Sequence, residues 1–483
     1  MKLHIARLAL FGTSAGLLFA CSSVVTNDFP DTGDGGTAVS PDAADAGNQD
    51  TGVADSGNAD SSVQTKSLGS LVSTGDVTLA DKTPFACGSA DASDHLCGVF
   101  RATVKPTQDP EGKSGVVNQI AEQKVLIVVR AKDESALARS RWVMLDAGGF
   151  GGSYGAQFGG VPPGHFVKGG KYGDDFVRAL NDDGYVTADV VYHCPTSGTD
   201  APCAGQPYAG WADDTSGAQA NKGQAAWFKG TGGTGYLGIS ARSAALLSWA
   251  YENAGKRSLC VHAQSSGSGR LAGAMTRYGS EKIVSSIIFS GGPVFAYVPW
   301  MCQTDGGTWG KRPEFYSTSQ DGALAALTHD CARSKQATCE VRDCRDKKYS
   351  AGMLDDSFAP GADLTWPSVN VGIVYGGKDD SAAWQHLKVW LPGYNGQAGI
   401  VGKTLTVKQG MCANDQATWA PGSPFGSRSC TDWSGANFSG IKKGTSADSY
   451  DARLKAVPHE VPETAEGTEV LRDLTRTLCP VTP

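Results

Sequence analysis

One stretch of the chain decides the fold, and it reads Ser258-Leu-Cys-Val-His-Ala-Gln-Ser-Ser-Gly-Ser-Gly-Arg270. Its first part is apolar, which predicts a strand over residues 258–263. Small residues follow, and helical spacing of apolar residues then predicts a helix over residues 269–278. The chain is therefore expected to pass from a strand into a helix through a tight turn of small residues.

The turn offers a serine as a candidate nucleophile. A nucleophile on a strained strand-to-helix turn needs small residues two positions before it and two after it, because larger side chains would clash. Ser265 has Ala263 and Gly267 at these positions, whereas Ser266 would place Gln264 at one of them. Ser265 is therefore the better candidate. The alternative is a turn that carries no chemistry, because a chain with 63 glycines produces such matches by chance.

Strand and helix patterns alternate on both sides of this stretch. The expected strands cover residues 125–130, 141–145, 185–192, 258–263, 283–290, 369–375 and 404–407. The expected helices cover residues 174–180, 237–251, 269–278, 382–390 and 465–478. Strands that alternate with helices predict an α/β fold with a mostly parallel central sheet and helices on both faces.

Two irregular stretches interrupt this alternation. The first, residues 293–367, holds four cysteines and is predicted to be an insertion or lid with disulfide bonds. The second, residues 392–450, holds two more cysteines. Both are treated as insertions within one domain of residues 67–483.

A second glycine-rich segment follows the strand predicted over residues 141–145, and it reads Asp146-Ala-Gly-Gly-Phe-Gly-Gly152. Glycines let backbone N–H groups approach a substrate oxygen closely. The candidate donors are the N–H groups of Gly148 and Gly149, joined by that of Ser266 in the turn that precedes the predicted helix. A phosphate-binding loop is excluded, because no Gly-Lys-Ser/Thr follows.

These two segments resemble the nucleophile elbow and the oxyanion loop of the α/β-hydrolases, a superfamily that includes serine esterases and lipases. The resemblance extends over about residues 120–478. The chain departs from the common pattern at Ala263, where glycine is usual, and at Asp146 and Ala147, which replace the histidine and glycine of the lipase loop. The resemblance implies that an acid and then a histidine follow the nucleophile along the chain.

Three histidines follow Ser265: His329, His386 and His459. The first lies in the cysteine-rich insertion, and the second lies inside the helix predicted over residues 382–390. His459 lies in a loop just before the last predicted helix, where the family places its catalytic base. The alternative is a surface or capping histidine.

The candidate acid lies in Val374-Tyr-Gly-Gly-Lys-Asp-Asp380, where a predicted strand ends in a turn before a helix. This turn resembles the one that carries the acid of the family. Asp379 is in register and Asp380 is the second choice. The acid would hold the imidazole in the productive tautomer and stabilise its charged form. The alternative is that both aspartates cap the helix that starts near Ser381.

The N-terminus resembles a bacterial lipoprotein signal over residues 1–21. Lys2 and Arg7 precede an apolar run over residues 8–19, which is too short for a membrane-spanning helix. The segment Leu18-Phe-Ala-Cys21 resembles a lipobox, in which Cys21 carries the lipid. Ser22 follows, and by resemblance to known sorting rules this favours the outer membrane, on its periplasmic or outer surface.

Residues 22–66 are predicted to be a disordered tether, because aspartate, glycine, alanine and serine give too little apolar surface to bury. Residues 1–65 hold two of the 42 basic and eight of the 49 acidic residues. The rest of the chain is therefore nearly neutral, and it lacks the basic excess that is typical of nucleic-acid binding.

The cysteines agree with export. Twelve of the 13 follow Cys21, and an even dozen in an exported chain predicts up to six disulfides. Cys87–Cys97 and Cys194–Cys203 are the expected local pairs, and the other pairings stay open. No C-x-x-C motif indicates zinc.

The resemblance implies acyl transfer to water, with His459 taking the proton of Ser265 as the serine attacks an ester carbonyl. The expected partners are an ester substrate (a lipid, a polyester or an acylated polysaccharide) and the membrane that holds the lipid anchor. No cofactor, metal ion or nucleic acid is expected. Two alternatives stay open, a serine peptidase with the same triad and a non-catalytic surface lipoprotein on a hydrolase scaffold.

Overall fold

The computed structural model describes about half of the predicted α/β domain of residues 67–483. The described residues are 67–87, 95–107, 120, 122–146, 170–192, 206–212, 235–292, 363–377, 399–410, 451–459 and 461–481. The predicted leader, Cys21 and the tether lie outside these ranges, as do the Cys194–Cys203 pair, the helix over 382–390 and most of both insertions.

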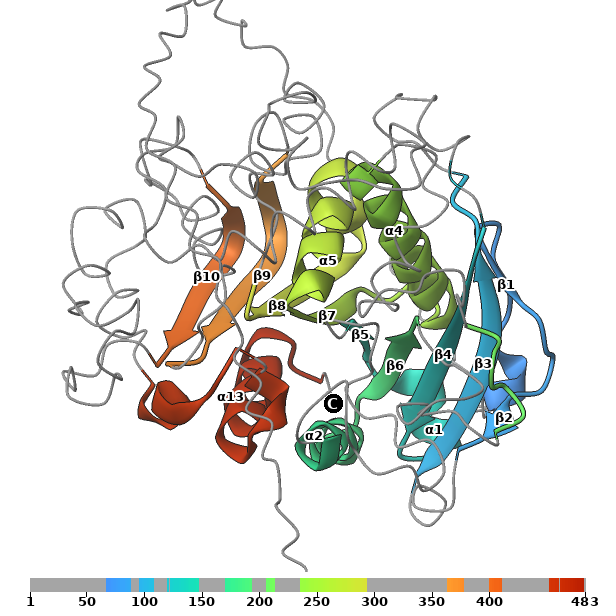
Figure 1. The fold of residues 1–483 in the computed structure, drawn as a ribbon, viewed down its shortest axis with the longest axis horizontal. Helices are drawn as coiled ribbons and strands as arrows, with labels where there is room; N and C mark the ends of the chain where they lie inside the picture. The colour runs from blue at the N-terminus through green and yellow to red at the C-terminus, as the bar shows by residue number, and fades with distance from the viewer. Residues whose placement is uncertain are drawn as a thin grey trace, which may run out of the picture. The chain divides into compact units, whose positions relative to one another are not determined.

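The described strands form one ten-stranded sheet with the order β1-β3-β4-β6-β5-β7-β8-β9-β10, and β2 pairs with β3. The strands are β1 (Val77–Leu79), β2 (Phe85–Ala86), β3 (Leu96–Val104), β4 (Gln123–Ala131), β5 (Trp142–Asp146), β6 (Val186–Val191), β7 (Leu259–Gln264), β8 (Val284–Ser290), β9 (Thr365–Tyr375) and β10 (Val401–Gln409). Figure 1 shows the order from β10 at the left to β1 at the right.

The sheet has a parallel part and an antiparallel edge. The six strands from β6 to β10 in the sheet order run parallel. The strands β1, β2, β3 and β4 pair antiparallel with their neighbours, and β4 is antiparallel to β6. The predicted α/β fold with a mainly parallel central sheet is therefore confirmed, whereas the strands of the antiparallel edge before β4 were not predicted.

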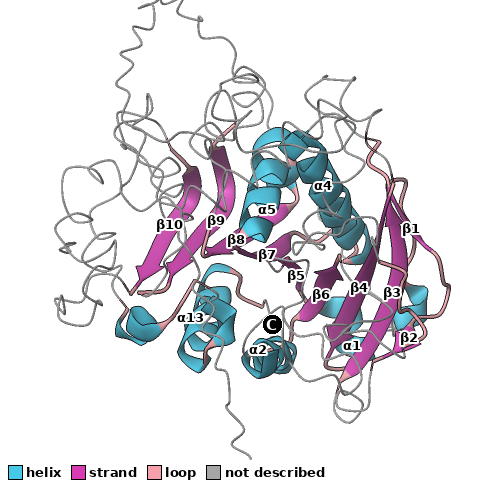
Figure 2. Ribbon diagram, viewed as in Figure 1, coloured by secondary structure: helices cyan, strands magenta, loops and turns pink. Residues whose placement is uncertain are grey.

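Helices cover both faces of the parallel part (Figure 2). The helices are α1 (Glu134–Arg139), α2 (Gly170–Asp182), α4 (Gly235–Asn253), α5 (Ser266–Arg277) and α13 (Ala465–Leu478), with 3₁₀ turns at Leu68–Ser70, Ser280–Lys282, Ala452–Ala456 and Val461–Glu463. The helices α4 and α5 pack together on one face, and α2 and α13 pack together on the other (Figure 1). None of the helices in the described ranges is long and apolar enough to cross a lipid bilayer.

The side chains of β5 contribute alternately to the apolar cores on the two faces of the sheet. Trp142 and Met144 belong to the apolar core under α4 and α5, and Val143 and Leu145 belong to the core under α2 and α13. Successive side chains of a strand point to opposite faces, so a strand buried on both faces is apolar throughout. This is why the continuous apolar runs predicted the central strands.

The order of the strands reverses beside β5. The chain passes from β5 through α2 to β6 on one side, and from β6 through α4 to β7 on the other side of β5. In open α/β sheets, ligands bind outside the carboxyl ends of the strands at such a reversal. The segments that follow β5 and β7 are the two that the sequence singled out.

The strand β9 begins at Thr365, inside the range predicted for the first insertion. Pro367 lies within this part of β9, although proline cannot donate to a sheet hydrogen bond. In this part β9 pairs only with β10, with an irregular register before Asn370, and β8 joins it from Asn370 onward. An edge with an irregular register tolerates proline, and β9 therefore begins four residues before the strand predicted over residues 369–375.

Two disulfides lie in the described residues. Cys87–Cys97 is one of the two predicted local pairs and is confirmed. Cys260–Cys479 links β7 to the residue after α13, over a sequence separation of 219. Both of its cysteines are buried. This second bond joins the strand before Ser265 to the helix that follows His459.

Candidate active site

Ser265 lies on a sharp turn between a strand and a helix. The strand β7 ends at Gln264 and α5 begins at Ser266. Ser265 has φ 49° and ψ −119°, and Lys256 is the other described non-glycine residue with positive φ. Such a backbone persists only where the surrounding structure holds it. The Ser265 N–H donates to the Ser290 carbonyl oxygen at 2.9 Å, which fixes the turn to the end of β8.

The small neighbours of Ser265 have distinct contacts. A Cβ atom on Gly267 would overlap the backbone carbonyl oxygen of Asp146, so only glycine lets α5 approach the end of β5. Ala263 is fully buried in the core under α4 and α5, and its methyl group is accommodated there. The departure from glycine at position 263 therefore does not disturb the turn.

His459 is brought to Ser265 from the other end of the domain. Its Nε2 atom lies 2.7 Å from the Ser265 Oγ atom, although 194 residues separate the two in sequence. Both residues are partly buried. A serine hydroxyl that donates to a neutral imidazole at this distance is the geometry required for proton transfer to a general base.

The loop that carries His459 lies across the carboxyl ends of β8, β9 and β10. A Cβ atom on Gly376, directly after β9, would overlap the carbonyl oxygens of Val457 and Pro458. The Gly377 N–H donates to the Leu454 carbonyl oxygen at 2.8 Å. The backbone of the loop therefore rests on the backbone of the strand ends, which sets the height of His459 above the sheet.

The structure leaves part of the predicted site untested. Asp379, Asp380, Gly148 and Gly149 lie outside the described residues. One described range ends at Gly377, two residues before Asp379, and the backbone of Gly377 contacts the loop that carries His459. Another described range ends with β5 at Asp146, two residues before Gly148. The Ser266 N–H is present at the first position of α5, where a helix has no internal acceptor for it.

A buried ion pair between Asp146 and Arg270 lies beside the elbow, and it was not predicted. The Arg270 Nη2 atom lies 2.5 Å from Asp146 Oδ1, and the two side chains are 1% and 0% exposed. The guanidinium carbon lies 4.7 Å from the ring centroid of Tyr192, directly after β6. Burial and the neighbouring Asp146 carboxylate raise the pKa of the Tyr192 hydroxyl well above its ordinary value. The only available signal was an arginine within a helix of small and apolar residues.

A fully buried histidine, His262, lies outside the site. The Thr475 hydroxyl donates to the Leu471 carbonyl oxygen at 2.7 Å, so it accepts from His262 Nε2 at 2.6 Å. The His262 Nδ1 atom has no hydrogen-bond partner among the described residues. Burial lowers the pKa of His262 to about 3, so the ring is neutral and links β7 to α13.

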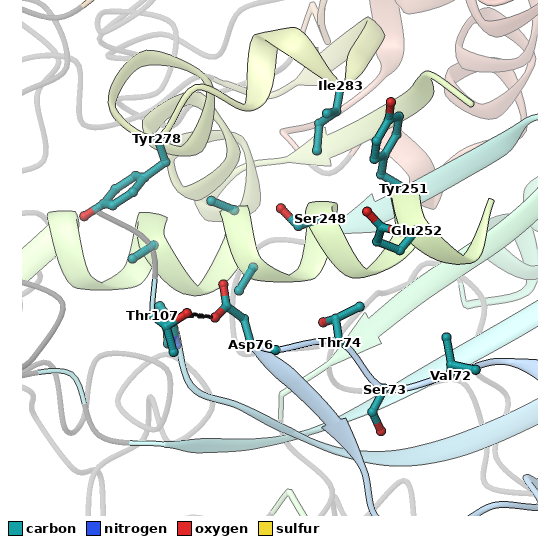
Figure 3. Close-up of a pocket in the computed structure, with 15 residues that line it drawn as sticks. Val72, Ser73, Thr74, Asp76, Thr107, Ser248, Tyr251, Glu252, Tyr278 and Ile283 are labelled. Atoms are coloured by element: carbon teal, nitrogen blue, oxygen red, sulfur yellow. Dashed lines mark hydrogen bonds between the residues drawn. The ribbon is translucent and has the colours of Figure 1, made fainter. Parts of the chain in front are cut away.

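A cavity of about 620 Å³ lies between the segment around β1 and the outer side of α4 (Figure 3). Asp76 and Glu252 contribute carboxylates to its wall, and Tyr251 and Tyr278 contribute rings. Of the candidate catalytic residues that the structure describes, neither Ser265 nor His459 lines this cavity. In the described ranges, no group of three or more histidine, cysteine, aspartate or glutamate side chains is placed to hold a metal ion.

No family model matches the chain, and no curated protein matches it. Solved structures that resemble it include a hyperthermophilic esterase from the archaeon Pyrobaculum calidifontis, with 13% identity, a TM-score of 0.35, and coverage of 80% of this chain and 84% of that one. A cold-adapted esterase from an Arctic intertidal metagenomic library has 12% identity and a TM-score of 0.30, and the match covers 68% of this chain and 90% of that one. Oligopeptidase B from Leishmania major has 12% identity and a TM-score of 0.36, and the match covers 66% of this chain and 33% of that one.

The chain thus spans about a third of the length of oligopeptidase B and of a prolyl endopeptidase. The strand order and the strained turn after β7 agree with the α/β-hydrolase assignment made from the sequence. All the TM-scores given above lie below 0.5, so the chemistry is inferred from the geometry of Ser265 and His459.

Proposed function

We propose that the protein is a serine hydrolase that cleaves carboxylic esters through an acyl-enzyme on Ser265. The observation that carries this proposal is the 2.7 Å contact between His459 Nε2 and a serine Oγ on a strained strand-to-helix turn. A serine that only stabilised the fold would not need a positive φ, which costs about 1–3 kcal/mol.

The reaction has two balanced halves. The Ser265 hydroxyl gives its proton to His459 Nε2 while Oγ bonds to the ester carbonyl carbon; the bond to the alcohol then breaks, and the alcohol leaves with that proton. A water molecule next attacks the acyl carbon and gives a proton to His459. His459 passes this proton to Ser265 Oγ as the acyl bond breaks, which releases the acid and restores the free serine. The N–H of Ser266, with those of Gly148 and Gly149, would hold the oxyanion.

Asp379 is the proposed acid of the triad, with Asp380 as the second choice. The support is positional: the backbone of Gly376 and Gly377 already contacts the loop of His459. A carboxylate two residues further on would lie close to the imidazole. Its role would be to orient His459 and to stabilise the imidazolium.

The proposed setting is the bacterial cell envelope, with a lipid on Cys21 and a disordered tether before the domain. Two disulfides in the described residues support an oxidising compartment. An anchored enzyme outside the cytoplasm would meet an ester that comes from outside, such as a lipid, a polyester or an acylated polysaccharide.

The test is covalent labelling followed by a substrate panel. The full chain, its Ser265→Ala variant and a matched control, Ser248→Ala on an exposed part of α4, are treated with a fluorophosphonate, and mass spectrometry locates the adduct. We expect an adduct on Ser265 in the first and third proteins only. Hydrolysis of p-nitrophenyl esters but not of peptide anilides would support an esterase, and the reverse would indicate a peptidase. A folded protein that neither labels nor turns over would be a non-catalytic binding lipoprotein.

A further inference from the structure

The ion pair between Asp146 and Arg270 joins the two segments that surround the candidate site. Asp146 is the last residue of β5, and Arg270 lies one turn into α5, on the same side of the helix as Ser266. The backbone carbonyl of Asp146 also meets the Cα atom of Gly267 closely enough to exclude any side chain there. The end of β5 is therefore fixed to the first turn of α5 by both its backbone and its side chain.

Residues from two neighbouring segments, the end of β5 and the residue directly after β6, contact the guanidinium group of Arg270. It pairs with Asp146 of β5 through Nη2–Oδ1 at 2.5 Å and through a longer Nε–Oδ2 contact at 3.4 Å. Its central carbon lies over the ring of Tyr192, directly after β6 and 4.7 Å from the ring centroid. A planar fork that pairs with a carboxylate and lies against an aromatic ring has a defined orientation, which a lysine or an apolar side chain would not have.

Stability alone does not account for a charged pair at this position. Both side chains are almost fully buried, and removing two charges from water costs much of what their attraction returns. Well-packed apolar residues of similar volume often stabilise a fold as well or better. What the charged fork adds is direction, at the place where the helix of the elbow meets the end of β5.

We infer that Asp146 and Arg270 are positioning residues for the reaction proposed above. They set the first turn of α5, and with it the Ser266 N–H, relative to the carboxyl end of β5. The oxyanion exists only in the tetrahedral state, so a shift of its donors lowers kcat and leaves KM nearly unchanged. A displacement of about 1 Å in such a site costs on the order of 100-fold in rate.

The test separates positioning from structure by removing both charges together. Each single variant, Asp146→Leu or Arg270→Met, leaves an unpaired buried charge and should lower the Tm. The double variant Asp146→Leu/Arg270→Met should regain the wild-type Tm or exceed it. Its kcat for a p-nitrophenyl ester should still be roughly 10–100-fold lower at a KM within about threefold of wild type. Its affinity for a boronic acid, which mimics the tetrahedral state, should fall by a similar factor.

A second variant keeps the inference testable if the double variant does not fold. Arg270→Lys retains the buried charge pair but loses the planar fork, so we expect a folded protein with reduced kcat and reduced boronate affinity. Wild-type kcat and boronate affinity in either folded variant would overturn the inference. A wild-type protein that neither labels with fluorophosphonate nor hydrolyses any ester would instead overturn the proposed function, so the two failures are distinguishable.

Discussion

The two faces of the sheet hold the two halves of the candidate site in different ways. Ser265 is continuous with α5, on the face where α4 and α5 share a large apolar core with the sheet. His459 precedes α13, on the face where α2 and α13 share a smaller apolar core. That second face adds polar and covalent links to its apolar contacts.

The links on the α13 face connect segments that are distant in sequence. Cys479 bonds to Cys260, His262 donates to Thr475, and Asp183 pairs with two arginines of α13. The nucleophile turn is formed by residues next to one another in the chain, whereas the position of the histidine depends on contacts across about 200 residues. The nucleophile turn and the histidine loop can therefore be weakened separately by substitutions on one face or the other.

The largest expected effect comes from the Cys260–Cys479 bond. Replacing both cysteines by alanine should lower the free energy of unfolding by about 2–5 kcal/mol, because the bond closes a loop of more than 200 residues. The matched control removes Cys87–Cys97, which closes a much shorter loop, and the chain-entropy model predicts a loss about 2–3 kcal/mol smaller. Denaturant unfolding of both double variants measures the difference. Equal losses would mean that the long-range bond does not secure the α13 face.

The next effect concerns the face of α4 and α5, where a substitution at Gly267 disturbs the turn after β7. Gly267→Ala places a methyl group against the Asp146 carbonyl, so α5 or β5 must move, and we expect a loss of about 1–3 kcal/mol in unfolding free energy. The rate of ester hydrolysis should fall on the order of 100-fold, because the N-terminus of α5 is displaced. Gly75→Ala is the control, since a Cβ atom there would meet nothing within 4 Å. Wild-type stability and rate in Gly267→Ala would contradict the close approach of the two segments.

The nucleophile turn was predictable from sequence because its signals are local. Strand, small residues and helix follow one another over residues 258–278, and the central strands show themselves as continuous apolar runs. The antiparallel edge was not predictable in the same way. Its strands β1 and β2 have three and two residues, too few for a period, and Arg101 and two small residues interrupt the apolar pattern of β3.

Long-range features were missed for a different reason. Spacing does not encode which cysteines pair, so nothing in the sequence linked Cys260 to Cys479. Charged side chains such as Asp146 and Arg270 are normally exposed, and no local pattern indicated that both are buried against each other. Of the candidate site, Ser265 and His459 were nominated from sequence, and the structure brings them together. Their roles remain the proposal made above.

A third effect concerns how the free energy of unfolding depends on pH through His262, which packs against α13. The pKa of His262 in the folded protein is about 3, below its ordinary value of 6.5, so the unfolded chain binds this proton more readily. The stabilisation by the neutral ring is complete above pH 6.5 and is lost as the pH falls toward 3. Between pH 7 and pH 5 the loss should be about 2 kcal/mol.

Denaturant unfolding at several pH values from 7 to 5 measures this loss. His262→Gln should remove the slope in this range. Asp183 does not contribute there, because its lowered pKa affects stability only near and below 3.8. A His262→Gln variant with the wild-type slope would show that another group on the α13 face titrates.

The smallest effect concerns the surface pair at the end of α13. Arg476 donates to Asp183, but its side chain is 50% exposed, and Arg472 pairs with the same carboxylate. Arg476→Ala should therefore lower the unfolding free energy by less than about 1 kcal/mol. Arg472→Ala, whose side chain is 32% exposed, should cost more. A larger loss for Arg476 would reverse this order and place the main support of α13 at its exposed end.

The most direct test asks whether His459, which precedes α13 on one face of the sheet, activates Ser265, which precedes α5 on the other face. The second-order rate constant for fluorophosphonate labelling of Ser265 is measured in the wild-type chain and in His459→Ala, with the Tm of each recorded. We expect labelling to slow by on the order of 1,000-fold or more at an unchanged Tm, because the serine loses its general base. Labelling of Ser265 at the wild-type rate in a folded His459→Ala protein would contradict this expectation.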